Sequence, residues 1–136
     1  MIGPIIALRA AIITSLRGDP TLTGLLGGAQ IYEDVPRTAV SPFVTFGEIS
    51  AKDWSTSTET GVEQVLTLNI WSKQTFMRRT LTVADRINNL LQDTHLTLNG
   101  HCLVTLHLTN IDSKYEDSGR WLRTSLRFRA VTEPNS

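Results

Sequence analysis

Three histidines and a cysteine in one short segment are the first side chains that suggest chemistry: His95, His101, Cys102 and His107. In a strand, His101 and His107 would share a face, but six positions at ~3.3 Å each separate them by about 20 Å. Two ligands of one zinc ion must each lie about 2 Å from it. Cys102 would point to the opposite face, where we expect a small buried hydrophobe. The spacing therefore predicts no metal site.

Other catalytic patterns are missing from the sequence. It contains no Gly-x-Ser-x-Gly elbow, no phosphate-binding glycine loop and no dinucleotide fingerprint. Gly24, Gly27 and Gly28 lie among leucines and predict a turn. No spacing singles out a carboxylate pair among the acidic residues Glu33, Asp34, Glu48, Asp53, Glu59 and Glu63. We therefore predict a protein that is not an enzyme and uses no cofactor.

Composition sets the broad class. The 136 residues fit one domain, residues 1–136, and are 40% hydrophobic and 19% charged. Thirteen basic and thirteen acidic residues balance, so no global field favours nucleic acid or membrane. Residues 1–16 are apolar but lack a basic start, Arg9 interrupts them, and no segment is long enough for a membrane span. We expect a soluble cytoplasmic product without a membrane partner and, with Cys102 alone, without an internal disulfide.

Two main helices are predicted by apolar spacing. The first starts at Pro4, a residue suited to a first helical turn, and ends at Gly18-Asp19-Pro20. The second spans residues 75–92. A short helical turn is expected around Leu22. The apolar stripe of the first helix is Ile5, Leu8, Ile12 and Leu16, and that of the second is Met77, Leu81, Ala84, Ile87, Leu90 and Leu91.

Alternating apolar and polar residues predict the strands. The polar stretch 51–61 is expected to be the mobile tip of a long hairpin, and residues 115–119 to connect the last two strands. This order predicts an α+β fold with both helices on one face of a mostly antiparallel sheet. The expected strands are residues 31–35, 43–50, 62–71, 101–113 and 120–132.

Two strands show a conflict between their apolar residues and a strict alternation. Both parities of residues 43–50 are apolar, which would suit a strand covered on two sides. Asn99-Gly100 predicts a two-residue turn, and this turn places Leu103 on the face opposite Leu106 and Leu108. Either a bulge shifts the register, or both faces of this hairpin are covered, which would favour an oligomer.

The outward face of the last strand carries a basic row, which we call the Arg row: Arg123, Arg127 and Arg129, with Arg120 just before it and Trp121 at its end. Guanidinium groups pair well with phosphates or with carboxylates of a neighbouring subunit. The alternative is a solvated strand face whose arginines discourage aggregation. Both interpretations remain open from the residues alone.

Trp54 is a second candidate for partner binding. It is flanked by Lys52 and Asp53 and by hydroxyl residues, so little local core is available to it. Exposed large aromatics are enriched in interface hot spots. The alternative is a loop that folds back and buries Trp54 on its own domain.

Several ordered segments resemble small tail-completion proteins of long-tailed phages. These are Ile31-Tyr32-Glu33-Asp34-Val35-Pro36, Ser41-Pro42-Phe43-Val44-Thr45-Phe46-Gly47, Leu66-Thr67-Leu68-Asn69-Ile70-Trp71-Ser72, Ala84-Asp85-Arg86-Ile87 and Leu126-Arg127-Phe128-Arg129-Ala130. The likeness covers nearly the whole chain and is greatest to the tail terminators of alphaproteobacterial gene transfer agents.

The resemblance implies a structural tail terminator. Such subunits form a ring, expected to be a hexamer, that caps the head-proximal end of the tail tube, stops its polymerisation and joins the head-side stopper while DNA passes through the lumen. It implies assembly in the bacterial cytoplasm and a place in the tail of a phage-like particle, and it transfers no catalytic residue. A closed ring needs two different complementary patches on each subunit. The Arg row on one side and the acidic pairs Glu33-Asp34 and Glu116-Asp117 on the other could supply them, with Tyr115 as a further contact.

Balanced charge suits a lumen that does not hold DNA tightly, and we expect the Arg row to face a neighbouring subunit rather than the lumen. The loop 51–61 is expected to reach an axial partner, either tube or stopper. Two alternatives remain: another connector ring, such as the stopper or a head-tail joining protein, and a small nucleic-acid-binding module.

Overall fold

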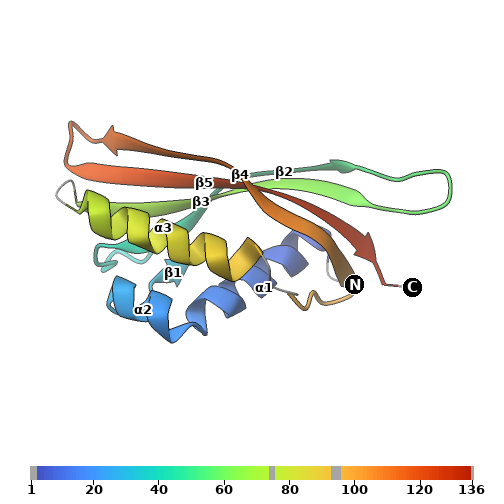
Figure 1. The fold of residues 1–136 in the computed structure, drawn as a ribbon, viewed down its shortest axis with the longest axis horizontal. Helices are drawn as coiled ribbons and strands as arrows, with labels where there is room; N and C mark the ends of the chain where they lie inside the picture. Colours follow the sequence, from blue (N-terminus) through green and yellow to red (C-terminus); the bar gives the residue numbers. More distant parts are fainter. Residues whose placement is uncertain (1–2, 74–75, 93–95, 136) are drawn as a thin grey trace.

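Three helices cover one face of a five-stranded sheet in the computed structural model, which describes residues 3–73, 76–92 and 96–135 (Figure 1). This arrangement confirms the predicted α+β class. Within those residues no helix has the length and apolar character needed to cross a membrane. The elements are α1 (Pro4–Arg17), α2 (Pro20–Leu26), β1 (Ile31–Tyr32), β2 (Phe43–Asp53), β3 (Val62–Lys73), α3 (Met77–Gln92), β4 (His101–Glu116) and β5 (Trp121–Pro134).

The sheet has the strand order β1-β2-β3-β5-β4. β1 pairs in parallel with β2, and the other neighbours are antiparallel, as the sequence predicted for most of the sheet. The central β3–β5 pair joins the two hairpins into one surface. β1 is shorter than the predicted strand 31–35, because the chain leaves the sheet at Glu33 and the following Pro36 has no N–H to donate.

Local sequence explains the helix ends. Pro4 occupies the first turn of α1. Asp19 caps α2 by accepting a hydrogen bond from the backbone N–H of Leu22 at 2.9 Å, and Gly27 ends this helix with a φ of 79°. The turn predicted around Leu22 is therefore a short helix. The predicted helix 75–92 is confirmed from Met77 onward, while residue 75 lies outside the described residues.

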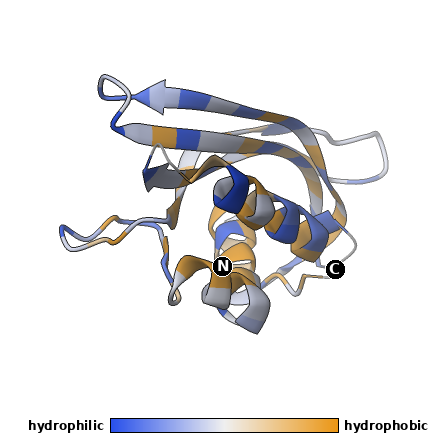
Figure 2. Cartoon of the chain, turned by 60° about the vertical axis from the view of Figure 1, so that its left-hand side comes forward, coloured by the Kyte–Doolittle hydropathy of each residue, from blue (hydrophilic) through white to orange (hydrophobic). Residues whose placement is uncertain are grey.

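The core lies between the helices and the face of the sheet that they cover, called here the inner face. Apolar side chains alternate with polar ones along β3 and β5, a pattern that Figure 2 shows as changing colour along the strands. The opposite face, called the outer face, has no helix against it in the described part of the chain (Figure 1). The buried inner-face residues of these strands include Leu66, Leu68, Ile70, Leu126, Phe128 and Ala130.

Bulges resolve both conflicts of alternation. A register shift between Phe46 and Ile49 in β2 brings these two side chains to the inner face, opposite Leu68 and Leu66. The expectation that β2 is covered on two sides is therefore wrong for most of the strand, although Phe43 packs on the outer side against Trp121.

In β4 a shift between Leu103 and Thr105 places Leu103 and Leu106 on one face, so the bulge alternative is confirmed for this hairpin. The Leu98–His101 bridge confirms the predicted turn register. The same shift separates His101, which is buried, from His107, which is exposed, so the prediction that they share a face is wrong. Cys102 was expected to be buried and is exposed, because it points to the outer face, which no helix of the described residues covers.

Candidate assembly surfaces

The Arg row lies on the outer face, as predicted. Arg123, Arg127 and Arg129 stand opposite Trp71, Thr67 and Val65 of β3, which belong to the parity that points away from the helices. Their positions are fixed by the buried residues between them, since Leu126 and Phe128 occupy the inner face.

Each of these arginines has a carboxylate partner within its own chain. Arg129 contacts Glu63 at 2.6 Å and 2.7 Å, and Lys52 contacts the other oxygen of Glu63 at 3.2 Å. The hydrogen bond from Arg129 is the main cause that lowers the pKa of Glu63 below its ordinary value, with a further contribution from Lys52. Glu63 therefore stays ionised and neutralises part of the basic row.

The other two arginines are paired similarly. Arg123 contacts Glu116 at 2.9 Å and lies 5.8 Å from the centroid of the Trp71 ring, while Arg127 approaches Glu48 at 3.9 Å. The carboxylates that the sequence analysis expected on a neighbouring subunit are thus supplied in part by the same chain. Glu116 could have been found from sequence by pairing the β4–β5 hairpin around its turn; Glu48 and Glu63 required the β2–β3–β5 adjacency.

Between the arginines, the outer face carries polar side chains that are joined by hydrogen bonds. Ser125 donates a hydrogen bond to the amide oxygen of Asn69 at 2.7 Å. The Trp71 indole donates to the Thr45 hydroxyl at 3.1 Å. Trp121, expected at the end of the row, packs edge-on against Phe43 with ring centroids 5.9 Å apart. The face presents hydrogen-bonding groups and compensated charge rather than an open basic patch.

The β2–β3 hairpin projects from the body as an arm (Figure 1). At its tip Trp54 remains 49% exposed, although its ring lies 4.9 Å from the Arg129 guanidinium carbon and its backbone N–H donates to the carbonyl of Gly61 at 2.9 Å. Asp53 accepts from the side chain and backbone of Ser55, and these bonds lower the pKa of Asp53. The tip is thus ordered by its own turn, yet about half of the surface of Trp54 is available to a partner.

The remaining predicted contacts lie at two different edges of the sheet. Glu33 and Asp34 follow β1 and are exposed, with Arg9 approaching Glu33 at 3.9 Å. Tyr115 lies near the end of β4 and is 53% exposed. The acidic pair Glu33-Asp34 and Tyr115 lie at opposite edges of the sheet, so they cannot form one site within a subunit.

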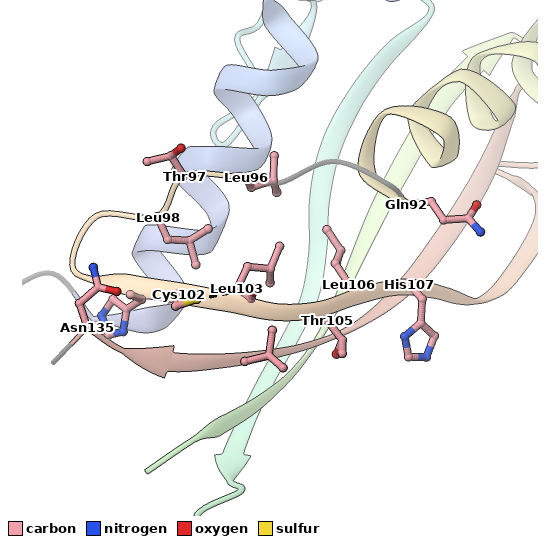
Figure 3. Close-up of a pocket in the computed structure, with 12 residues that line it drawn as sticks. Gln92, Leu96, Thr97, Leu98, Cys102, Leu103, Thr105, Leu106, His107 and Asn135 are labelled. Carbon is pink, nitrogen blue, oxygen red and sulfur yellow. Dashed lines mark hydrogen bonds between the residues drawn. The ribbon is translucent and has the colours of Figure 1, made fainter. Parts of the chain in front are cut away.

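A hollow lies beside the first half of β4, where Leu103 and Leu106 face Leu96 and Leu98 (Figure 3). His101, Cys102 and His107 also line it, but no group of three or more His, Cys, Asp or Glu side chains among residues 3–73, 76–92 and 96–135 could hold a metal ion. His95 lies outside the described residues. We infer no ligand from the hollow.

Residues 10–133 match the family described as Tail completion protein gp17, and the chain belongs to this family. This confirms the resemblance to tail-completion proteins, which are structural components of the virion tail and not enzymes.

A chain from the virion of a native gene transfer agent (GTA) particle has the same fold. The two chains superpose with a TM-score of 0.88 over 98% of this chain and 99% of that one, at 24% sequence identity. No protein with a curated description is detectably similar in sequence.

Proposed function

We propose that the protein is a tail terminator. Six copies form a ring on the head-proximal end of the tail tube, stop tube polymerisation and join the tail to the head-side stopper. Assembly takes place in the bacterial cytoplasm before the particle is complete. The observation that carries the proposal is membership of the tail completion family over residues 10–133, with a fold shared along nearly the whole length of a GTA virion chain.

The outer face suits the lining of the lumen through which DNA passes. The Arg row was expected to face a neighbour because a dense basic lining would retard DNA. Since Glu48, Glu63 and Glu116 already pair with the three arginines, the net charge of this face is low. Phosphate affinity grows with the number of uncompensated basic contacts, so a paired row lets DNA slide. The helices then lie on the outside of the ring.

The arm suits a contact along the ring axis. It projects beyond the body, and its tip carries Trp54 with Lys52 and Asp53 beside it (Figure 1). A half-exposed Trp is a frequent interface hot spot. We assign this tip to docking on the tube or on the stopper.

The test is the mass of the purified protein, alone and mixed with the tail-tube subunit of the same particle. A six-fold species, formed alone or induced by the tube protein, is the expected result. Electron microscopy of tubes capped at one end would then identify the terminator rather than another connector ring. A chain that stays monomeric in the presence of the tube protein would contradict the proposal.

A further inference from the structure

Exposed apolar side chains gather at the two opposite edges of the sheet. β4 forms one edge, and β1 with the loop that follows it forms the other. Ile111 and Tyr115 of β4 are 43% and 53% exposed, and Val35 and Val40 of the loop are 51% and 64% exposed. Isolated exposed apolar residues are common, but pairs of them at both ends of one sheet are a basis for association.

The second half of β4 is an uncovered edge. Ile111 and Tyr115 stand opposite the buried Leu126 and Leu122, so they point to the inner face, yet both remain exposed there. In the described residues β4 pairs only with β5, which leaves one side of its backbone free to accept another chain. Asp112 and Lys114 stand opposite Ser125 and Arg123, so they point to the outer face. We call these four residues the β4 edge patch: Ile111 and Tyr115 on its inner side, and Asp112 and Lys114 on its outer side.

The other edge carries the β1 loop, defined as residues 33–40. Nearly all of it is exposed, and its internal support is slight: the N–H of Ala39 bonds to the carbonyl of Pro36 at 3.1 Å. Val35 and Val40 therefore have no core to join in their own subunit.

The charges of the two edges are complementary. Within residues 3–73, 76–92 and 96–135, Asp34 and Arg37 of the loop have no ion-pair partner, and neither do Asp112 and Lys114 of the β4 edge patch. Each edge thus offers one acid and one base without an ion-pair partner, and on β4 this pair lies on the face of the strand opposite the two exposed apolar side chains.

We propose that the β4 edge patch of one subunit receives the β1 loop of the next copy, with Val35 and Val40 covering Ile111 and Tyr115. This inference rests on the proposed ring, since a ring closes only through two different surfaces. Pairing of β4 with β4 would bury the same patch twice and stop at a dimer. The loop-to-edge contact instead repeats around the ring and leaves the outer face towards the lumen and the arm free for an axial partner.

Site-directed cross-linking tests the contact. In a Cys102→Ser background, Val35→Cys and Ile111→Cys are purified separately, mixed, assembled with the tube protein and treated with a short bismaleimide. We expect a cross-linked pair only in the mixture, and a ladder that ends at the size of the ring in the doubly substituted protein. Ile6→Cys on α1, more accessible than Val35 at 63% against 51% exposed, is the control with Ile111→Cys and should give no product.

The possible results distinguish a failure of the proposed contact from a failure of the proposed ring. Cross-linking of Ile111→Cys to itself, or a ring of full mass without the mixed product, would overturn the contact and leave the ring standing. A failure of unmodified protein to form any ring would overturn both. As a second readout, Ile111→Ser should weaken ring assembly about tenfold or more while Ile6→Ser does not, with unchanged melting temperature in each.

Discussion

The two faces of β3 and β5 carry opposite properties on the same strands. The inner face presents Leu68 and Phe128, both fully buried under the helices. The adjacent outer positions present Asn69, which is polar and covered by its outer-face neighbours, and the exposed Arg127. One residue along the strand changes an apolar core side chain into a polar one on the outer face. The comparison indicates that the inner face supplies the core that stabilises the subunit, while side chains on the outer face can serve contacts in the assembly.

The largest expected effect is on the inner face. Phe128→Ala removes a fully buried aromatic side chain, and we expect it to lower the free energy of unfolding by about 3–5 kcal/mol. The matched outer change, Arg127→Ala, should cost at most about 0.5 kcal/mol, since its ion pair is long and exposed. Urea denaturation of both variants measures the difference. Equal losses would show that the outer face also stabilises the subunit.

The contrast between the faces was largely predictable from sequence, because alternation along residues 62–71 and 120–132 separates them. The positions of the bulges could not be predicted, because a register shift depends on how the neighbouring strand pairs. The shift between Leu103 and Thr105, for example, is defined by their partners in β5. The same limit explains the wrong predictions for Cys102 and for His101 and His107.

The pairing of β3 with β5 could not be predicted from the sequence either, since no local pattern specifies which strands of the two hairpins lie side by side. The pairing of Glu63 with Arg129 depends on that adjacency and was missed for this reason. By contrast, the Arg row needed only the alternation of a single strand and was placed correctly.

A smaller effect is expected in the helix layer. Asp19 caps α2 and also binds Arg86 of α3 through two hydrogen bonds of 2.7 Å and 2.9 Å. Asp19→Ala removes the cap and the ion pair together and should cost about 1–2 kcal/mol. Asp85→Ala, next to Arg86 but exposed, is the control and should change stability little.

The Asp19 carboxylate also makes the stability of the subunit depend on pH. The hydrogen bond from Arg86 lowers the pKa of Asp19 in the folded state, so folding favours the ionised form. Its contribution is complete above the unfolded pKa of about 3.9 and is lost as the pH falls through the lower folded value. Asp19→Asn should therefore flatten the loss of stability below about pH 4. An unchanged acid limb in chemical denaturation would contradict this account.

A substitution in the Arg row network of the outer face should change DNA binding more than stability. Glu63→Gln leaves Arg129 and Lys52 without their shared carboxylate. We expect a much smaller loss of stability than for Phe128→Ala, because both cations remain accessible to water. We expect tighter, more salt-dependent retention of the assembled ring on DNA, because uncompensated cations release more counterions. Glu59→Gln, in the exposed loop of the arm, makes the same charge change away from the Arg row. Equal retention of the two variants would argue against the outer face as the DNA lining.

A small change in stability is also expected at the arm, where the half-exposed Trp54 contributes little to the subunit. Trp54→Ala loses its contact with Arg129, worth about 0.5–1 kcal/mol at an exposed site. If the tip docks on an axial partner, the same substitution should abolish capping of tail tubes while rings still form. Ser57→Ala, in the same exposed loop, is the matched control. Capping by the Trp54 variant at the level of the control would place the axial contact elsewhere, and loss of the ring itself would assign Trp54 to the contact between subunits.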